Sequence, residues 1–214
     1  MAPARRVALV EWARRCEGWI VEDDYDGEFR YDRQPVGAMQ GLDPSRVVYG
    51  GTASKSLAAG LHIAWLVLPP SLVEPVTESS RWRVGVSAID QAALADFITT
   101  GHLDRHLRQM RVAYRRRRDE VIATLRTRAP WMTMSGVSAG LHGTVLLDGS
   151  PNRELDLLAR AQRSSVGFHP LSAHRDAPGR PGLVIGYSRP AAHEFRGALE
   201  RLGQLVSALP EPDA

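Results

Sequence analysis

Lysine is nearly absent from this chain of 214 residues, although positive charge is not. Lys55 is the one lysine among 27 basic residues, and every other is arginine. This bias reflects a coding preference, since alanine and glycine are abundant as well. A lysine that persists against it is informative, so the stretch 47-VVYGGTASKSLAAGLH-62 needs a chemical explanation.

Cysteine and long apolar runs are also scarce. Cys16 is the single cysteine, which excludes an intrachain disulfide. No stretch approaches the roughly 18 consecutive apolar residues that a membrane-spanning helix needs, and the apolar run near Met1 is too short for a secretory signal. We therefore expect a cytoplasmic protein with no membrane role.

A large excess of one charge is missing too. The chain has 27 cations, 24 anions and a formal net charge of +3, whereas nucleic-acid binding needs positive charge concentrated on one face. Arg115 to Arg118 are consecutive, but four successive helical residues surround the helix instead of forming a stripe. We interpret this segment as a solvated helix, with a DNA contact as the alternative.

Apolar segments separated by glycine and proline predict an α/β fold, and 43% apolar residues suffice for a globular core. Strands are predicted at 19–21, 47–49, 62–68, 141–147 and 183–188, and helices at 4–17, 71–80, 88–99, 101–128, 152–165 and 191–208. Residues 129–214 form a second block, which we interpret as a separate α+β lobe joined through the long helix.

An acidic cluster, 22-EDDYDGE-28, follows the first predicted strand. Side chains alternate along an extended chain, so the carboxylate of Asp23 and the phenol of Tyr25 face one side. A calcium loop is a rival because the acids and Gly27 match its first positions, but its twelfth position is Arg33, which removes the bidentate ligand. A solvated turn is the third interpretation. The histidines lack metal-ligand spacing: His102, His106, His142 and His169.

Small polar residues follow the second predicted strand around Lys55. A phosphate-binding P-loop is excluded, because Ser54 stands where that motif requires glycine. Hydroxyls and backbone amides around one amine suit an anion held beside a nucleophilic lysine, and a surface lysine is the alternative. Both strands end in polar residues that converge at one sheet edge, where ligands of open α/β sheets bind.

Together the two clusters resemble the cofactor site of pyridoxal-phosphate enzymes of the aspartate-aminotransferase fold, in particular the aminotransferase-like domain of MocR-type GntR-family regulators. The resemblance covers nearly the whole chain, through WIVEDDYDGEFRYD, VVYGGTASKSLAAGLHIAWLVLPP, GHLDRHLRQMRVAYRRRRDEV and GLVIGYS. It implies the C-terminal part of a fold-type-I large domain at 1–100, a connecting helix at 101–128 and a small α+β domain at 129–214.

The resemblance also implies roles for single residues. Lys55 matches the lysine that attaches covalently to pyridoxal 5'-phosphate. Asp23 matches the acid that pairs with the pyridine nitrogen, and Tyr25 the phenol that hydrogen-bonds the ring hydroxylate. Thr52 and Ser54 match phosphate-contacting positions.

This chain departs from the family pattern at two places. His62 stands where the family has an arginine that clamps the phosphate with a fixed fork of donors, and a histidine is shorter and in general only partly charged near neutral pH. We therefore expect weaker cofactor binding. Relatives that transaminate often carry an arginine for the substrate carboxylate in the late strand. Here that position falls near Val184, and Arg180 and Arg189 flank it.

Three functions follow from the resemblance. The chain is an effector-sensing part of a regulator that responds to an amino acid or amine, part of a metabolic aminotransferase, or a non-functional remnant. Relatives form homodimers, and regulators contact DNA through a winged-helix domain that does not appear here. The phosphate loop and the ring-stacking residue do not appear either. We therefore expect a C-terminal portion that is not a competent aminotransferase, with Trp19, Ile20, Val47 and Val48 uncovered.

Overall fold

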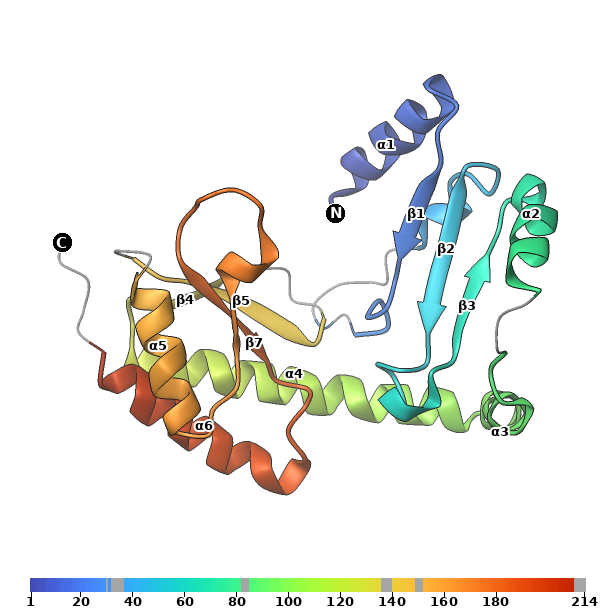
Figure 1. Cartoon of the computed structure of the whole chain (residues 1–214). Helices are drawn as coiled ribbons and strands as arrows, with labels where there is room; N and C mark the ends of the chain where they lie inside the picture. The colour runs from blue at the N-terminus through green and yellow to red at the C-terminus, as the bar shows by residue number, and fades with distance from the viewer. Residues whose placement is uncertain (30, 32–36, 82–84, 136–139, 149–151, 210–214) are drawn as a thin grey trace. The chain divides into compact units, whose positions relative to one another are not determined.

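The computed structural model describes residues 1–29, 31, 37–81, 85–135, 140–148 and 152–209 (Figure 1). The chain divides into two compact units. The first comprises Met1–Glu28 and Arg33–Arg108, and the second Phe29–Asp32 and Gln109–Ala214. Helix α4, His102–Arg128, contributes residues to both units. The family-based division at residues 100 and 128 stays a prediction.

A three-stranded sheet forms the centre of the first unit. Its strands are β1 (Ile20–Asp23), β2 (Val47–Thr52) and β3 (Ala64–Val67), in the order β1-β2-β3. Strands β1 and β2 are parallel, whereas β2 and β3 are antiparallel. The three strands predicted from the sequence for this part of the chain are therefore confirmed, with β2 three residues longer at its polar end.

Helix α1 (Pro3–Arg15) covers part of this sheet. A proline in its first turn lacks the amide hydrogen that a helix start leaves unpaired. The small core joins α1 to the sheet and to the 3-10 helix Met39–Gly41, through Val10, Ala13, Ile20, Met39 and Val47. At 2.6 Å, Arg14 pairs with Asp43 in the loop before β2. Hydrogen bonds from Ser45 and Arg14 lower the pKa of Asp43 to about 2.

The expectation that Trp19, Ile20, Val47 and Val48 are uncovered is wrong for three of them. Ile20 and Val47 are buried because α1 and the Met39 turn pack on them, and Val48 is buried as well, while Trp19 is exposed as expected. The exposed residues of the first unit's secondary structure lie mainly on other elements. All four residues of β3 are exposed, and no residue of α2 (Pro70–Ser80) or α3 (Ala88–Thr99) is buried.

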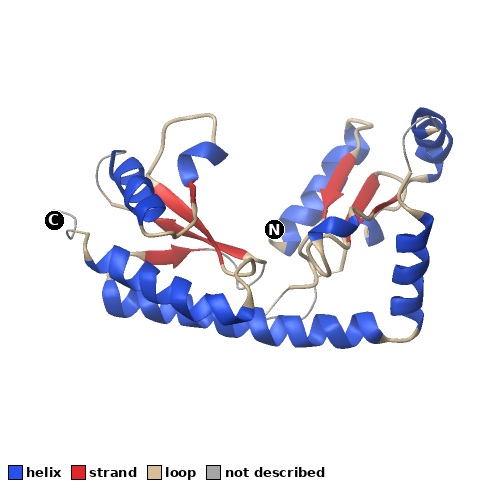
Figure 2. Ribbon diagram, turned by 60° about the horizontal axis from the view of Figure 1, so that its bottom comes forward, coloured by secondary structure: helices blue, strands red, loops and turns tan. Residues whose placement is uncertain are grey.

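The second unit is a four-stranded antiparallel sheet with helices against it (Figure 2). The strands follow the order β4-β5-β7-β6, with bounds Thr133–Ser135, His142–Leu146, Gly182–Gly186 and His169–Pro170. Helices α5 (Asn152–Arg163) and α6 (Ala192–Ser207) complete it. The main core joins all these layers through the following side chains: Val121, Leu125, Val145, Leu157, Leu183 and Val206.

Two buried charged residues hold segments of the second unit. Arg117 of α4 donates to the carbonyls of Tyr187, Ser188 and Pro190, where the chain passes from β7 to α6. Glu154 accepts from the backbone amide of Gly182 at 2.7 Å and from Ser172. Burial by itself would raise the pKa of Glu154, but the hydrogen bonds from Ser172 and Gly182 outweigh it and lower this pKa. Within the described residues, no helix combines the length and the apolar character needed to cross a bilayer.

Candidate functional site

The strand directions bring the predicted site residues to one edge of the first sheet. Because β1 and β2 are parallel, their carboxyl ends meet at the same edge, where Asp23 lies opposite Gly50 (Figure 1). Strand β3 runs the other way and therefore begins there, with Ala64 opposite Thr52. His62 precedes that strand by two residues. The backbone thus gathers the segments that carry the predicted carboxylate, phenol, amine, hydroxyls and imidazole.

The acidic loop after β1 is held by Asp24, the neighbour of the predicted acid. Its backbone amide donates to the Gly50 carbonyl at 2.9 Å, and its carboxylate accepts from the Tyr49 hydroxyl at 3.1 Å. A side chain at Gly27 would begin 2.2 Å from Asp24 Oδ1. Asp24 therefore occupies the space over Gly27 and fixes the loop, while Asp23 is exposed at the end of β1.

Tyr25 is half-buried in this loop. Burial, and then the negative charges of Asp26 and Asp23, raise the pKa of Tyr25. The phenol therefore stays protonated at neutral pH and is a hydrogen-bond donor. Strand β1 ends at Asp23, so Tyr25 lies in the loop beyond it, and the alternation predicted for these two side chains does not extend to the phenol.

Tyr49 is a polar residue of this site that the sequence reasoning missed. Burial, and then the charge and hydrogen bond of Asp24, raise the pKa of Tyr49 to about 12. In the sequence, Tyr49 ends the apolar run Val47-Val48-Tyr49 and is therefore predicted to belong to a buried strand. Its parallel pairing with Glu22 places it beside the acidic cluster, and that pairing depends on strand register, which the sequence does not specify.

Lys55 is exposed on a turn that follows β2. The Thr52 hydroxyl donates to the Ile63 carbonyl at 2.9 Å and accepts from the Ser54 amide at 3.0 Å. The Leu57 amide donates to the Ala53 carbonyl at 2.9 Å and closes the turn. The turn therefore presents the amine outward from a closed loop.

The two predicted phosphate contacts differ in what they offer a ligand. The Thr52 hydroxyl hydrogen is already given to Ile63, so Thr52 offers an anion no donor in this arrangement. Within the described residues no hydrogen bond engages the Ser54 hydroxyl, which leaves it as the donor of the pair. His62 is exposed, and its φ of 49° lies in the left-handed region, where non-glycine residues are uncommon.

The arginines considered for a substrate carboxylate lie in the second unit. Arg180 pairs with Asp148 and donates to the Leu147 carbonyl at 3.3 Å, so it is engaged. Arg189 is exposed, and His169 is the cross-strand partner of Val184. In the described part of the chain, no group of three or more His, Cys, Asp or Glu is arranged around one metal position. The calcium-loop position Arg33 lies outside the described residues.

Comparisons with known proteins show that this chain is similar to transcriptional regulators and to aminotransferases. No family model matches the chain. An uncharacterized HTH-type transcriptional regulator of Bacillus subtilis is 35% identical over 206 residues, which are 94% of this chain and 44% of the relative. The probable rhizopine catabolism regulatory protein of Rhizobium meliloti is 36% identical over 211 residues, 95% of this chain and 42% of the relative. The chain thus spans less than half the length of these curated regulators.

Solved structures agree with these relatives. The kynurenine aminotransferase of Pyrococcus horikoshii, whose structure holds PMP, superposes with a TM-score of 0.82 at 27% identity. The superposition covers 96% of this chain and 52% of that structure. The predicted fold, an α/β fold of the aminotransferase type with a further α+β part, is confirmed by this likeness.

Proposed function

We propose, on the premise that this chain has the aminotransferase fold and is related to MocR-type regulators, that it is the effector-sensing, cofactor-binding part of such a regulator. The observation that supports this proposal is the sheet edge to which β1 brings Asp23 and the loop with Tyr25, and β2 the turn with Lys55, in a chain that matches a regulator over 94% of its own length. Residues 1–100 would belong to the large domain, 101–128 to the connecting helix and 129–214 to the small domain.

The chemistry of this edge fits pyridoxal 5'-phosphate. The cofactor supplies an aldehyde that condenses with amines and a ring that withdraws electrons. Lys55 offers an exposed primary amine as the covalent attachment point. Asp23 would hold a proton at the ring nitrogen, and Tyr25, protonated because of its raised pKa, would donate to the ring oxygen. Ser54 and His62 are the candidate phosphate contacts.

An amino acid or amine effector acts on the same edge in this proposal. Its primary amine would have the same chemistry as the Lys55 amine, so Lys55 would be the residue whose position depends on the effector. In the complete regulator that change would reach a winged-helix DNA-binding domain, in a homodimer located in the cytoplasm. A metabolic aminotransferase is the second candidate, because an aromatic-amino-acid aminotransferase of Thermococcus litoralis is 27% identical over 216 residues.

Reductive labelling tests the proposed cofactor site. The protein is incubated with pyridoxal phosphate and reduced with borohydride, and the labelled peptide is identified by mass spectrometry. Label is expected on Lys55, because the N-terminal amine is the one other primary amine in the chain. The variant Lys55→Arg should lose this label. Label on the N-terminus alone would overturn the proposal.

A further inference from the structure

A histidine of α4 contacts the turn that carries Lys55. The Nε2 atom of His106 lies 2.8 Å from the carbonyl oxygen of Ser56. Fifty residues separate the two in sequence, and both belong to the first unit. A carbonyl oxygen only accepts hydrogen bonds, so Nε2 carries the hydrogen. The contact is therefore a directed hydrogen bond from the helix to the residue after Lys55.

The hydrogen bond from His106 comes from a distant element, whereas the hydrogen bonds of Thr52 in this turn are local. The hydrogen bonds of Thr52 with Ile63 and Ser54 arise within the segment that leads from β2 to β3. They fix the side of the turn before Lys55. The bond from His106 acts on the other side and comes from a long helix. Lys55 thus sits between a local anchor and a distant one.

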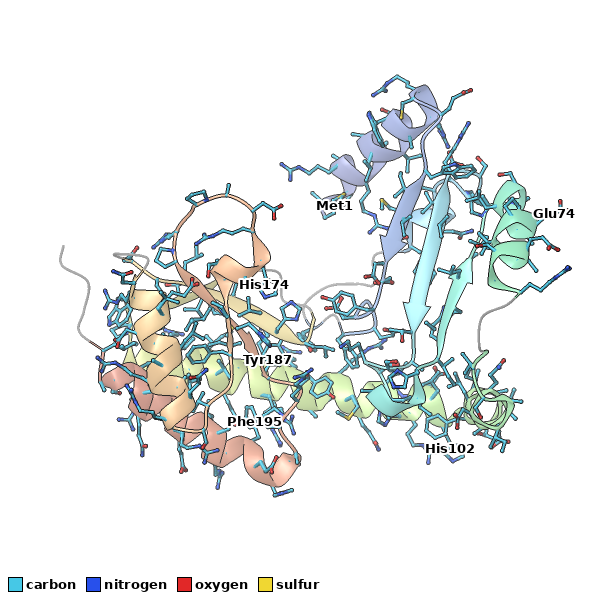
Figure 3. The ribbon with its side chains drawn as sticks, viewed as in Figure 1. Met1, Glu74, His102, His174, Tyr187 and Phe195 are labelled. Carbon is cyan, nitrogen blue, oxygen red and sulfur yellow. The ribbon has the colours of Figure 1, made fainter. Side chains whose placement is uncertain are left out.

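The ring of His106 is itself held by its neighbours. Its centroid lies 6.5 Å from that of Phe97, at the end of α3. His102, labelled in Figure 3 at the start of α4, stacks on the same Phe97 with centroids 5.7 Å apart. His102 bonds the Thr100 hydroxyl at 2.7 Å instead of the lysine turn. The two histidines therefore share one aromatic contact and differ in the Ser56 bond.

We propose that His106 is a positioning residue for Lys55, acting through the Ser56 carbonyl. It restrains the backbone that carries the amine and does not itself touch a ligand. A restrained turn leaves the Lys55 backbone fewer conformations, so less conformational entropy would be lost on attachment to a cofactor. This last consequence rests on the proposed function, whereas the restraint of the turn does not.

Hydrogen exchange followed by mass spectrometry measures the restraint without any cofactor. The variants are His106→Leu, which removes the donor, and His106→Asn, which is polar but too short to reach Ser56. His106→Gln keeps a donor near the position of Nε2. His102→Leu is the matched control, because it disturbs the same Phe97 contact. Peptides from the second unit report whether each variant remains folded.

Exchange in residues 53–57 should become faster by about fivefold in His106→Leu and His106→Asn, the effect of losing one net hydrogen bond. His106→Gln should restore much of the protection, and His102→Leu should leave this segment unchanged. Equal exchange in His106→Asn and the parent protein would overturn the proposal. So would an equal effect of His102→Leu, because the aromatic contact would then explain it.

Titration with pyridoxal phosphate separates this inference from the proposed function. Cofactor affinity should fall about fivefold in His106→Asn and recover in His106→Gln, in parallel with the exchange rates. If the parent protein is not labelled at Lys55 while exchange still responds to His106, the anchor stands and the cofactor proposal fails. If Lys55 is labelled but exchange does not respond, the cofactor proposal stands and the anchor fails.

Discussion

At the scale of single residues, the neighbours of the proposed reactive groups have structural tasks. Asp24 accepts a hydrogen bond from Tyr49 and lies over Gly27, so it shapes the loop that follows Asp23 and carries Tyr25. A carboxylate that accepts a hydrogen bond from a half-buried phenol is held in one orientation. Within the acidic cluster, Asp24 thus shapes the loop, while Asp23 is exposed at the sheet edge.

Replacing Tyr49 by phenylalanine should lower the free energy of unfolding by about 1 kcal/mol at neutral pH, through loss of the bond to Asp24. The folded-state pKa of Tyr49, about 12, is above its ordinary value of 10. Its contribution is therefore fully present below pH 10 and is lost as the pH rises towards 12. Urea unfolding between pH 7 and pH 11 should show the two proteins converging above pH 10. A difference that grows with pH would contradict this assignment.

His62→Arg should tighten the binding of pyridoxal phosphate by about tenfold, because a permanently charged fork replaces an imidazole at the proposed phosphate contact. Position 62 has a left-handed backbone, which is similarly unfavourable for histidine and for arginine. The free energy of unfolding should therefore change little. His62→Gly is the control, since it relieves the backbone but removes the side chain. Fluorescence titration of the cofactor measures all three affinities. Equal or weaker binding by the arginine variant would mean that His62 does not face the phosphate.

Much of the candidate site was open to prediction from the sequence, because the strands and their polar ends are local patterns. Tyr49 and His106 were not, and for a common reason. The role of Tyr49 depends on the register of β1 against β2, and that of His106 on a contact fifty residues away. Residue types alone specify neither the register of two strands nor which residues far apart in the sequence come into contact.

At the scale of elements, α4 is held to the second unit by a buried cation. The Arg117 guanidinium donates to three carbonyls at 3.3, 3.1 and 2.8 Å. It also lies 4.9 Å from the ring centroid of Phe195. Tyr187 and Phe195, both labelled in Figure 3, belong to the turn after β7 and to α6. One side chain therefore links three elements.

Arg117→Met should lower the free energy of unfolding by about 3 kcal/mol, because one buried and two partly buried carbonyls lose their charged donor. Arg117→Lys should also be destabilising, since an ammonium lacks the planar fork. Arg116→Met, on the exposed face of the same helix, is the matched control and should change stability by under about 0.5 kcal/mol. Denaturant unfolding followed by circular dichroism provides the comparison. Equal effects at the two positions would show that the carbonyl contacts add nothing.

Most elements could be predicted, and the exceptions have a physical explanation. Helix α4 was predicted at 101–128 and begins one residue later, at His102. Strands β4 and β6 were not predicted, because three and two residues are too short to show alternation. Strand β6 also contains Pro170, which is tolerated at the edge of a sheet that only tertiary pairing defines.

At the scale of the whole molecule, the two units differ in how well they cover their apolar residues. The second unit holds the larger core, which joins strands to three helices. The first unit leaves apolar side chains exposed on a strand and on both short helices, at Trp65, Leu66, Val67, Val73, Ile89 and Ile98. Strand β3 also ends the sheet as an edge. An exposed apolar edge strand favours pairing with another chain.

The chain by itself should therefore self-associate, bind pyridoxal phosphate weakly and transfer no amino group faster than the free cofactor does. Leu66 is 56% exposed on β3, so Leu66→Lys places a charge on the associating edge without opening the core. Light scattering against concentration should show less association in this variant, while circular dichroism remains unchanged. Val21→Lys, 71% exposed on the opposite edge strand β1, is the matched variant that reports whether both edges take part. A parent protein that stays monomeric at high concentration and exchanges amino groups between an amino acid and a keto acid would contradict this prediction, because such activity requires a covered sheet and a complete cofactor site.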